Sequence, residues 1–436
     1  MIDWLEERRL KSRMAFEPIP FSSSREWIIS DEAFRHRTGS FFSVEGISAT
    51  ADLPALDGVC QPIINQPEVG ILGFVLVRAG TGYSWLVQAK AEPGNVGGVQ
   101  LAPTVQATRS NYMRKHGGDA THYLDHFLKE HREYSSDSLQ SEQGTRFLRK
   151  FNRNISVLLA ERPHLVNPYF SWFSSAEMRR ALRASYAINT DARSVMVSAP
   201  WCFLADSPEA FGNSHASRLG LQASYRASAR VGIVGLAQTF LDVQRQAIAL
   251  EVTQVPLSCL ADWHVGHDSI MPRSPEARGL VVRHYSVQAP EREKAHWDQP
   301  LVLSSSSDTV ILFAQERAGV ICFLLRPAYE IGLTGGVELG PSYKQENAAS
   351  QPAWLATLAS SGQYDTLVEV EQSDEGGRFM QARSRYAVCL LPDSVAVPDD
   401  PGNFWVTLGE LETLCHAAKM LTNEARSVTS LLLAFA

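Results

Sequence analysis

The chain has 436 residues, of which 44% are hydrophobic and 20% are charged, so it can bury a sizeable core and is not a disordered protein. Its formal net charge of -7 argues against a protein that coats nucleic acid. The first residues (MIDWLEERR) are charged where a signal peptide needs an apolar run, and no stretch reaches the ~18 apolar residues of a membrane span, which predicts a cytoplasmic protein.

In chain order, the first strong pattern is a β-hairpin. Residues 70–77 are apolar, and residues 83–90 alternate in part between apolar and polar side chains after a turn with two glycines. A helix is expected over residues 175–182, because a serine can cap its start and Glu177 lies in its first turn. Residues 217–252 then form a connector with helical stretches, whose small residues allow close helix contact.

The second half repeats this order of elements. A second hairpin is predicted from strands at residues 310–314 and 319–325, and a helix over residues 408–421 corresponds to the helix in the first half. Short strands are also expected at residues 99–101, 156–159, 337–339 and 387–390.

Blocks of sequence recur in the same order about 230 to 245 residues apart. Examples are residues 97–103 (GGVQLAP) with 335–341 (GGVELGP), 140–147 (QSEQGTRF) with 372–379 (QSDEGGRF), and 191–195 (DARSV) with 424–428 (EARSV). Because chance rarely gives collinear matches of this kind, we interpret the chain as two copies of one module. The expected domains are a first module with an N-terminal extension (residues 1–205), a helical connector (206–265) and a second module (266–436).

The densest group of polar side chains follows the first hairpin, in residues 88–95 and 103–112. Gln88 and Lys90 alternate on one face of a strand, where they could hydrogen-bond sugar hydroxyls and hold a phosphate. A pair of solvated loops can have the same composition, so the residues alone leave both interpretations open. The candidate ligand-binding side chains are Gln88, Lys90, Glu92, Asn95, Gln106, Thr108, Arg109, Asn111 and Tyr112.

These segments resemble the NDP-hexose 2,3-dehydratase family. The resemblance rests on residues 36–42 (HRTGSFF), 61–73 (QPIINQPEVGILG), 88–95 (QAKAEPGN), 103–112 (PTVQATRSNY) and 140–154 (QSEQGTRFLRKFNRN), and it spans nearly the whole chain. The family tends to have a tryptophan two residues before the Gln-Pro pair. The first copy has Val59 there, whereas the second copy keeps Trp297.

The resemblance implies an α/β chain of the α+β type, built from two tandem Nudix-like modules with mixed sheets and flanking helices, usually as a homodimer. It also implies a lyase that removes the C2 hydroxyl of a nucleotide-linked 4-keto-6-deoxyhexose, commonly dTDP-4-keto-6-deoxyglucose, in deoxysugar biosynthesis. No metal or other cofactor is expected, since the glutamate-rich Nudix box is not found in the sequence. A downstream 3-ketoreductase is expected to consume the unstable diketo product.

Elimination beside a ketone needs a base at C3, donors at the C4 oxygen and an acid for the leaving hydroxyl. We expect Glu92 to act as base or acid and Lys90 to face the enolate oxygen, while Tyr112 or His36 carries the second proton. Planar arginine side chains suit phosphate oxygens. The expected diphosphate ligands are Arg37, Arg109 and Arg146, and the further expected binding residues are Thr38, Glu338 and Tyr343.

The first copy is expected to carry most of the chemistry, because residues 330–332 replace the Glu-Pro-Gly turn with Glu-Ile-Gly and residues 342–344 replace Thr-Val-Gln with Ser-Tyr-Lys. The second copy is then a scaffold, or it contributes a few groups to a shared cleft. Two other functions stay open, namely a non-catalytic nucleotide-sugar binding protein and a metal-dependent pyrophosphohydrolase.

A zinc site is disfavoured. His122 and His126 would share a face of an expected helix that also carries Asp119, Asp125 and His131, but no HExxH glutamate accompanies them. The six cysteines are scattered without a CxxC pair, which predicts reduced thiols.

Overall fold

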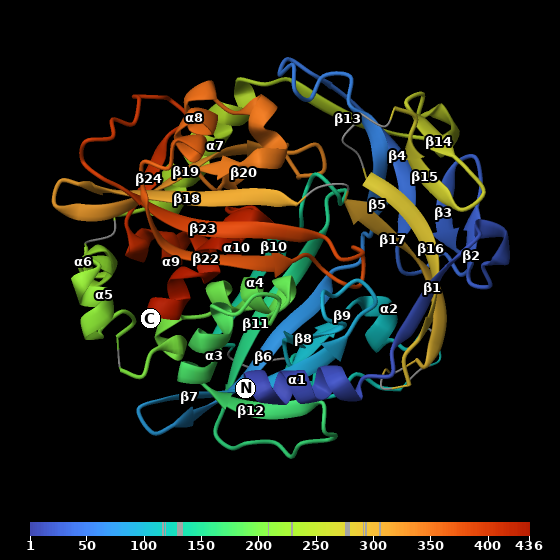
Figure 1. Ribbon diagram of the computed structural model, residues 1–436, viewed down its shortest axis with the longest axis horizontal. Coiled ribbons are helices and arrows are strands. Elements are labelled where there is room, and N and C mark those ends of the chain that lie inside the picture. The colour runs from blue at the N-terminus through green and yellow to red at the C-terminus, as the bar shows by residue number, and fades with distance from the viewer. Residues whose placement is uncertain are drawn as a thin grey trace.

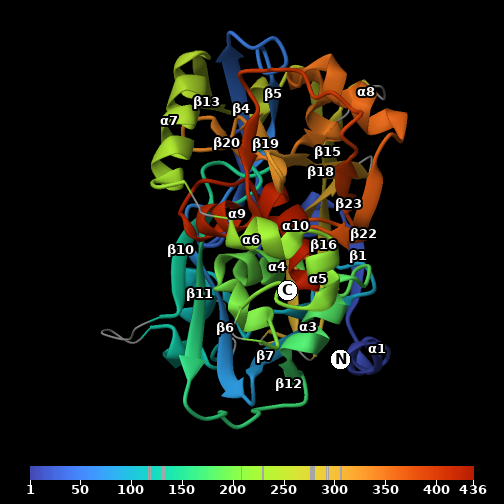
Figure 2. The ribbon, with the colours of Figure 1, turned by 90° about the vertical axis from the view of Figure 1, so that its left-hand side faces the viewer.

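The computed structural model describes residues 1–115, 117, 119–128, 134–207, 209–227, 230–274, 280–290, 292, 294–304 and 307–436. Over these residues the chain combines helices with mostly antiparallel sheets, two of them large and two small (Figures 1 and 2). The predicted combination of helices and mixed sheets is therefore confirmed. No helix of the described ranges is both long enough and apolar enough to cross a membrane.

The first large sheet contains the hairpin that the sequence predicts. Its strands are β6 (Gly70–Ala79), β7 (Gly82–Ala91), β8 (Val99–Ala102), β9 (Val105–Ala107), β10 (Ser136–Ser141), β11 (Phe151–Leu159) and β12 (Phe170–Ser174). They pair in the order β10-β11-β6-β7-β12, with β8 beside β7 and β9 beside β6. Only the β11–β6 pair of these described strands is parallel.

The second large sheet has the same pattern of pairing. Its strands are β18 (Asp308–Arg317), β19 (Val320–Tyr329), β20 (Val337–Gly340), β21 (Tyr343–Lys344), β22 (Asp365–Ser373), β23 (Arg383–Leu391) and β24 (Phe404–Val406). The order β22-β23-β18-β19-β24, with β20 beside β19 and β21 beside β18, reproduces the first sheet strand by strand. Its β18–β23 pair is again parallel.

Each small sheet takes one strand from the other half of the chain (Figure 1). The first small sheet comprises β2 (Trp27–Ile29), β3 (Ala33–His36), β4 (Ser43–Ala51), β5 (Cys60–Asn65) and β13 (Leu250–Val255). The second comprises β1 (Ala15–Ile19), β14 (Trp263–Val265), β15 (Ser269–Pro272), β16 (Leu280–Gln288) and β17 (His296–Ser304). Thus β1 pairs with β16 and β13 pairs with β4, both antiparallel, which ties the two halves together.

The helices cover the large sheets and fill the space between them. They are α1 (Ile2–Lys11), α2 (Arg109–Tyr112), α3 (Ser175–Leu182), α4 (Thr190–Ser198), α5 (Ser214–Arg218), α6 (Leu221–Arg226), α7 (Ile233–Gln246), α8 (Ala353–Ser361), α9 (Leu408–His416) and α10 (Asn423–Ser430). Both α3 and α9 begin with a capping box, formed by Ser174 with Glu177 and by Thr407 with Glu410. The helix at 175–182 is confirmed, whereas the predicted helix over 408–421 ends at His416.

Two buried helices, α4 and α10, pack against each other between the halves (Figures 1 and 2). Each carries an arginine that reaches into the other half. Nη2 of Arg193 in α4 donates to the carbonyl oxygen of Ser373 at 3.2 Å, and Nη2 of Arg426 in α10 donates to that of Ser141 at 2.5 Å. Since a buried guanidinium must find acceptors, these contacts fix a loop of each half on the helix of the other.

The loop after β22 also interlocks with the turn after β7. The backbone N–H of Gly94 donates to the carbonyl oxygen of Gly376 at 2.8 Å, and the N–H of Gln381 donates to that of Gly94 at 2.8 Å. A Cβ atom on Gly94 would lie 1.7 Å from the carbonyl oxygen of Phe379. Only glycine therefore fits at this point.

The same contact recurs between the turn after β19 and the loop after β10. The N–H of Gly332 donates to the carbonyl oxygen of Gly144 at 2.7 Å, and a Cβ atom on Gly332 would lie 2.0 Å from that of Phe147. The halves are thus joined by two equivalent contacts between backbones.

Replacing Gly94 by alanine tests this contact. Because the added methyl group meets backbone atoms that cannot rotate away, Gly94→Ala should lower the free energy of unfolding by about 3 kcal/mol or more. The control is Gly235→Ala in α7, where a Cβ atom meets nothing within 4 Å, and it should be neutral or stabilise by up to about 1 kcal/mol. Urea unfolding monitored by circular dichroism gives both values, and equal stability of the two variants would contradict the interlock.

Candidate active site

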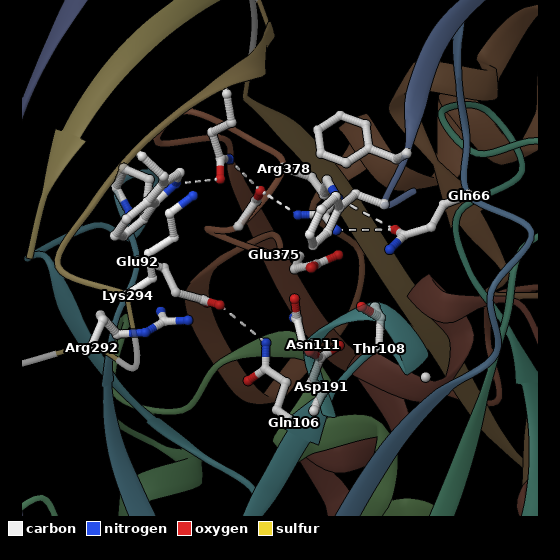
Figure 3. A pocket seen from close by; sticks show the side chains of 18 of the residues that line it. Gln66, Glu92, Gln106, Thr108, Asn111, Asp191, Arg292, Lys294, Glu375 and Arg378 are labelled. Atoms are coloured by element: carbon white, nitrogen blue, oxygen red, sulfur yellow. Dashed lines mark hydrogen bonds between the residues drawn. The ribbon is translucent and has the colours of Figure 1, made fainter. Parts of the chain in front are cut away.

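A cavity opens where the first large sheet, the first small sheet, β17 and the loop after β22 meet (Figure 3). We call it the first cleft. Both halves of the chain contribute to it, and its polar floor and walls include Lys90, Glu92, Gln106, Asp191, Glu375 and Arg378.

Glu92 and Lys90 lie together at the end of β7. They are 4% and 5% exposed, and Lys90 Nζ lies 3.6 Å from Glu92 Oε1. Gln106 of β9 binds both groups. Its main-chain carbonyl oxygen accepts from Lys90 Nζ at 2.9 Å, and its side-chain Nε2 donates to Glu92 Oε1 at 3.2 Å. Glu92 Oε2 is buried and has no hydrogen-bond partner among the described residues. A carboxylate oxygen is thus held at the cavity, ready for a ligand.

Two further acidic groups face this pair. A Cβ atom on Gly377 would lie 3.4 Å from Oε1 of Glu92 and 3.3 Å from Oε1 of Glu375, so the two carboxylates border the same turn. Burial raises the pKa of Glu375; Arg378 opposes this rise and the charge of Glu92 adds to it. Burial also raises the pKa of Asp191 in α4 well above its usual range, and Glu375 adds to the rise. Burial therefore favours the neutral form of both Glu375 and Asp191 in this cleft.

Cations and aromatic rings form the outer walls. The guanidinium of Arg292 lies 5.9 Å from the ring centre of Trp297, and Lys294 forms an ion pair with Glu26. On another wall, Arg378 lies 4.2 Å from the ring centre of Phe42 and donates to Gln66. Cations beside flat rings suit a ligand that joins a phosphate group to an aromatic base.

The structure brings several of the predicted residues to the first cleft. Burial lowers the pKa of His36, whose Nδ1 lies 2.7 Å from Oγ1 of Thr38, so its imidazole is neutral at pH 7. The predicted residues that line the cleft are His36, Lys90, Glu92, Gln106, Thr108 and Asn111.

The other predicted residues lie elsewhere. Arg37, Thr38 and Arg109 are exposed and outside the lining of the cleft, and Tyr112 packs against an apolar cluster around Val105. Asn95 is buried in its turn, where its amide donates to the carbonyl oxygen of Lys90.

Gln88 borders a neighbouring cavity with Tyr169. Glu338 is buried at the contact between the halves, and Tyr343 packs in the core of the second half.

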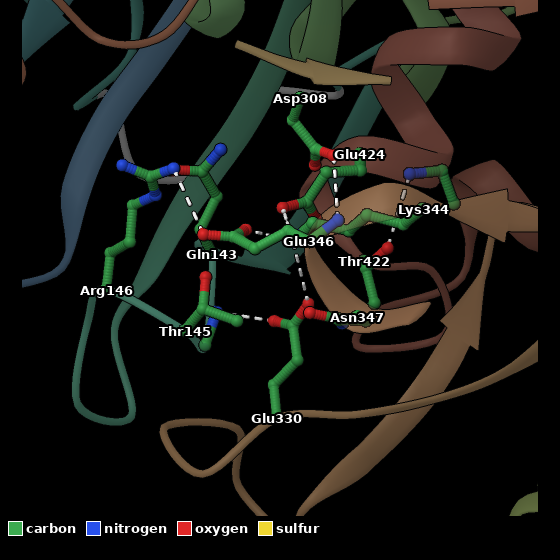
Figure 4. A network of polar contacts seen from close by, with 12 residues as sticks. Gln143, Thr145, Arg146, Asp308, Glu330, Lys344, Glu346, Asn347, Thr422 and Glu424 are labelled. Atoms are coloured by element: carbon green, nitrogen blue, oxygen red, sulfur yellow. Dashed lines mark hydrogen bonds and ion pairs between the residues drawn. The ribbon is translucent and has the colours of Figure 1, made fainter. Parts of the chain in front are cut away.

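Arg146 lines a second cavity, which we call the second cleft (Figure 4). The second cleft is the counterpart of the first, with Glu330 in the place of Glu92 and Lys344 in the place of Gln106. Lys344 Nζ lies 2.6 Å from Glu424, 3.1 Å from Glu346 and 3.4 Å from Glu330. A lysine that is already surrounded by carboxylates distinguishes this cleft from the first.

Several charges of the second cleft are paired with one another, although Nε and Nη1 of Arg146 and Oε2 of Glu424 are buried without a hydrogen-bond partner among the described residues. Burial would raise the pKa of Glu346, but the Lys344 ammonium and the Arg146 guanidinium outweigh it and lower that pKa to about 2. Burial and the neighbouring Glu424 raise the pKa of Glu330 to about 7, although Lys344 opposes them. The network therefore balances its buried cations from within.

Among the residues of the first cleft that sequence reasoning missed are five charged ones, Asp191, Arg292, Lys294, Glu375 and Arg378. Three of them belong to the repeated blocks around residues 191–195 and 372–379, so the repeat could have drawn attention to them. Only the spatial crossing of the loops assigns Glu375 and Arg378 to the first cleft and Arg146, the counterpart of Arg378, to the second.

The prediction of a helix around His122 is wrong. Only Leu124–His126 form a short 3-10 turn there, and His131 lies outside the described residues. Within the described ranges, no group of three or more His, Cys, Asp or Glu side chains is placed to hold a metal ion. The described cysteines are free, with Cys389 and Cys415 buried.

The chain belongs to the NDP-hexose 2,3-dehydratase family, whose model matches residues 1–198 and 236–432. It is 32% identical over 437 residues to a dTDP-4-dehydro-6-deoxy-alpha-D-glucopyranose 2,3-dehydratase from Saccharopolyspora spinosa, with 98% of this chain and 89% of the relative covered. Proteins of the same name from Amycolatopsis orientalis and Streptomyces violaceoruber are 31% and 32% identical, each over 98% of this chain and over 88% and 94% of their own lengths.

Glu338 makes stability depend on pH. Burial raises the pKa of its carboxyl group from 4.5 to about 7. The contribution of the protonated side chain to the free energy of unfolding is therefore complete below pH 4.5 and is lost as the pH rises through 7. Ser141 donates to Glu338, whereas the first half has Gln100 at the matching position, with its amide 2.6 Å from Ser373. Glu338→Gln should therefore raise the free energy of unfolding at pH 8, by up to about 3 kcal/mol, with little change at pH 4.5. Urea unfolding at both pH values tests this, and an equal effect at both would contradict it.

Proposed function

We propose that this chain removes the C2 hydroxyl of dTDP-4-keto-6-deoxyglucose as water and so acts as a hydro-lyase of deoxysugar biosynthesis. The observation that carries the proposal is the buried pair of Glu92 and Lys90 at the cavity, where one carboxylate oxygen of Glu92 has no hydrogen-bond partner within the described part of the chain. The names of the three relatives support the substrate.

The proposed reaction uses the acidity that a C4 ketone gives to the C3 hydrogen. Glu92 takes the C3 proton, and the electron pair moves to the C4 oxygen, where Lys90 stabilises the enolate. The C2–O bond then breaks as the C4 carbonyl re-forms, and the hydroxyl leaves with a proton as water. The remaining enol becomes a 3,4-diketo-2,6-dideoxy sugar, without any net oxidation. Since this diketone is reactive, a 3-ketoreductase is the expected next enzyme.

The nucleotide is proposed to bind along the outer walls of the first cleft. Arg292 and Lys294 supply positive charge for the diphosphate, and the ring of Trp297 suits a flat base. This arrangement replaces Arg37 and Arg109, which are exposed, and Arg146, which lines the second cleft. Local cations are needed because the chain as a whole carries a net charge of -7.

We also propose that the chain is a tandem duplication of a Nudix-like module. The matching strand orders of the large sheets support it. Arg9 of α1 donates to the carbonyl oxygen of Val99 in β8, and Arg245 of α7 donates to that of Val337 in β20. These equivalent contacts favour a second module that begins at α7, earlier than the boundary at residue 266 that the sequence suggests.

Turnover distinguishes this function from its alternatives. Incubation with dTDP-4-keto-6-deoxyglucose and a 3-ketoreductase should give a product that has lost one water, detected by mass spectrometry. Release of a nucleoside monophosphate would indicate a pyrophosphohydrolase, and unchanged substrate would indicate a binding protein.

In the same assay, Glu92→Gln should lower the rate at least ~100-fold, because the amide cannot take the C3 proton. The matched control is Glu330→Gln in the second cleft, which keeps the first cleft intact and should leave the rate largely unchanged. Equal losses in the two variants would show that both clefts take part.

Nucleotide binding can be tested without turnover. Arg292→Ala should weaken the binding of dTDP about 10- to 100-fold, since a charge-assisted hydrogen bond to phosphate is lost. Arg109→Ala, which removes an exposed arginine outside the cleft, should bind dTDP normally. Calorimetric titration gives both affinities. Weaker binding by Arg109→Ala together with normal binding by Arg292→Ala would instead assign the diphosphate to Arg109.

A further inference from the structure

Glu375 stands in the first cleft although it belongs to the second half of the chain (Figure 3). We propose that Glu375 is the acid that protonates the C2 hydroxyl as it leaves, working with Glu92 as the base. This inference rests on the proposed function and names the second proton-transfer group of the same reaction.

The geometry places two carboxyl groups, from two different segments, beside Gly377. Oε1 of Glu92 and Oε1 of Glu375 lie 3.4 and 3.3 Å from the point where a Cβ atom on Gly377 would stand. A side chain at position 377 would therefore intrude between them, and the counterpart of Gly377 in the second cleft is Thr145. The glycine leaves room for a substrate that both carboxyl groups can reach.

The two carboxyl groups have different surroundings. Glu92 Oε1 accepts from Nε2 of Gln106 and lies 3.6 Å from Nζ of Lys90. Burial favours the neutral form of Glu375. The ionisable groups that face it are Lys90 at the end of β7, Glu92 after β7, Glu142 and Lys150 before β11, Asp191 of α4, and Arg378 of its own loop. Paired carboxyl groups whose environments differ in this way are suited to act as base and acid.

The first half of the chain fixes the position of Glu375. Nη2 of Arg193 donates to the carbonyl oxygen of Ser373 at 3.2 Å, and the N–H of Gly94 donates to that of Gly376 at 2.8 Å. These bonds hold the backbone on both sides of Glu375, so its carboxyl group enters the cleft at a set place. A proton donor must be positioned in this way to act within the transition state.

The second cleft supplies a natural comparison. At the matching position it has Gln143, whose Nε2 donates to Asp374 at 3.2 Å. An amide cannot deliver a proton to a leaving hydroxyl, so the second cleft lacks the proposed acid even though it keeps the carboxylate of Glu330. The difference between Glu375 and Gln143 therefore assigns the complete acid and base pair to the first cleft.

The step balances without an external reagent. The C2–O bond breaks while C2=C3 forms and the C4 enolate returns to a ketone, and the hydroxyl takes the proton of Glu375 to become water. The C3 proton is left on Glu92. Proton exchange with solvent then returns both carboxyl groups to their starting states. The enol becomes the diketone when C2 gains a proton and the C3 hydroxyl loses one.

Exchange of the C3 hydrogen with heavy water separates the acid from the base. The full-length wild-type protein, Glu375→Gln and Glu92→Gln are each incubated with dTDP-4-keto-6-deoxyglucose in D₂O, and deuterium at C3 is measured by NMR alongside water loss. Glu375→Gln should lower kcat about 100-fold or more while substrate still gains deuterium at C3, because its base is intact. Glu92→Gln should lose both exchange and elimination.

Two controls exclude a purely structural effect. Glu369→Gln, which changes an exposed glutamate on the neighbouring strand β22, should behave as wild type, and Glu375→Gln should keep wild-type affinity for dTDP. Loss of exchange together with elimination in Glu375→Gln, or an unchanged kcat, would overturn the assignment. If the wild type eliminates water and Glu375→Gln eliminates and exchanges at the same rates, only this role of Glu375 is refuted. If the wild type itself does not eliminate water, the proposed function is refuted.

Discussion

The structure depends on a mutual exchange of loops between the two halves. The loop after β22 contacts the turn at Gly94, and the loop after β10 contacts the turn at Gly332, at distances that leave no space for a side chain. The buried guanidinium groups of Arg193 and Arg426 hold these loops from the other side. Since each contact joins one half to the other, neither half alone contains a finished cleft.

The exchange also explains how one repeated framework gives two different clefts. In the second cleft, Lys344 is neutralised by three carboxylates, so the cost of burying its charge is offset within the protein. In the first cleft, Gln106 takes that position, and one oxygen of Glu92 has no partner among the described residues. The repeat places Gln143 where the first cleft has Glu375, so only the first cleft has a carboxyl group at that position to work with the glutamate after the turn, and it is the better place for the proposed chemistry.

Binding and proton transfer occupy different parts of the same cavity. The groups at the floor, around Lys90 and Glu92, suit the reacting hexose, and the cations and rings of the outer walls suit a nucleotide. Because Arg292, Lys294 and Glu375 come from the second half, both tasks need both halves. A chain of net negative charge can thus bind an anionic sugar nucleotide through a few placed cations.

Local sequence was sufficient for features that depend on neighbouring residues. The hairpins at β6–β7 and β18–β19 follow from apolar strands around glycine turns, the helix α3 from its cap, and the repeat from collinear blocks. The polar character of the segment that contains Lys90, Glu92 and Gln106 was also visible in the sequence. The resemblance of these segments to NDP-hexose 2,3-dehydratases was sufficient to predict the family.

The tertiary structure alone decided which residues meet across the chain. Arg146 and Arg378 lie in equivalent blocks, and no local property shows that the loop exchange sends each to the cleft of the other half. Likewise, Tyr112 and Arg109 are adjacent to lining residues in sequence, yet the turn of α2 directs one to an apolar cluster and the other to solvent. Sequence therefore determined the elements and the chemical class, whereas the contacts between distant backbones determined the composition of the site.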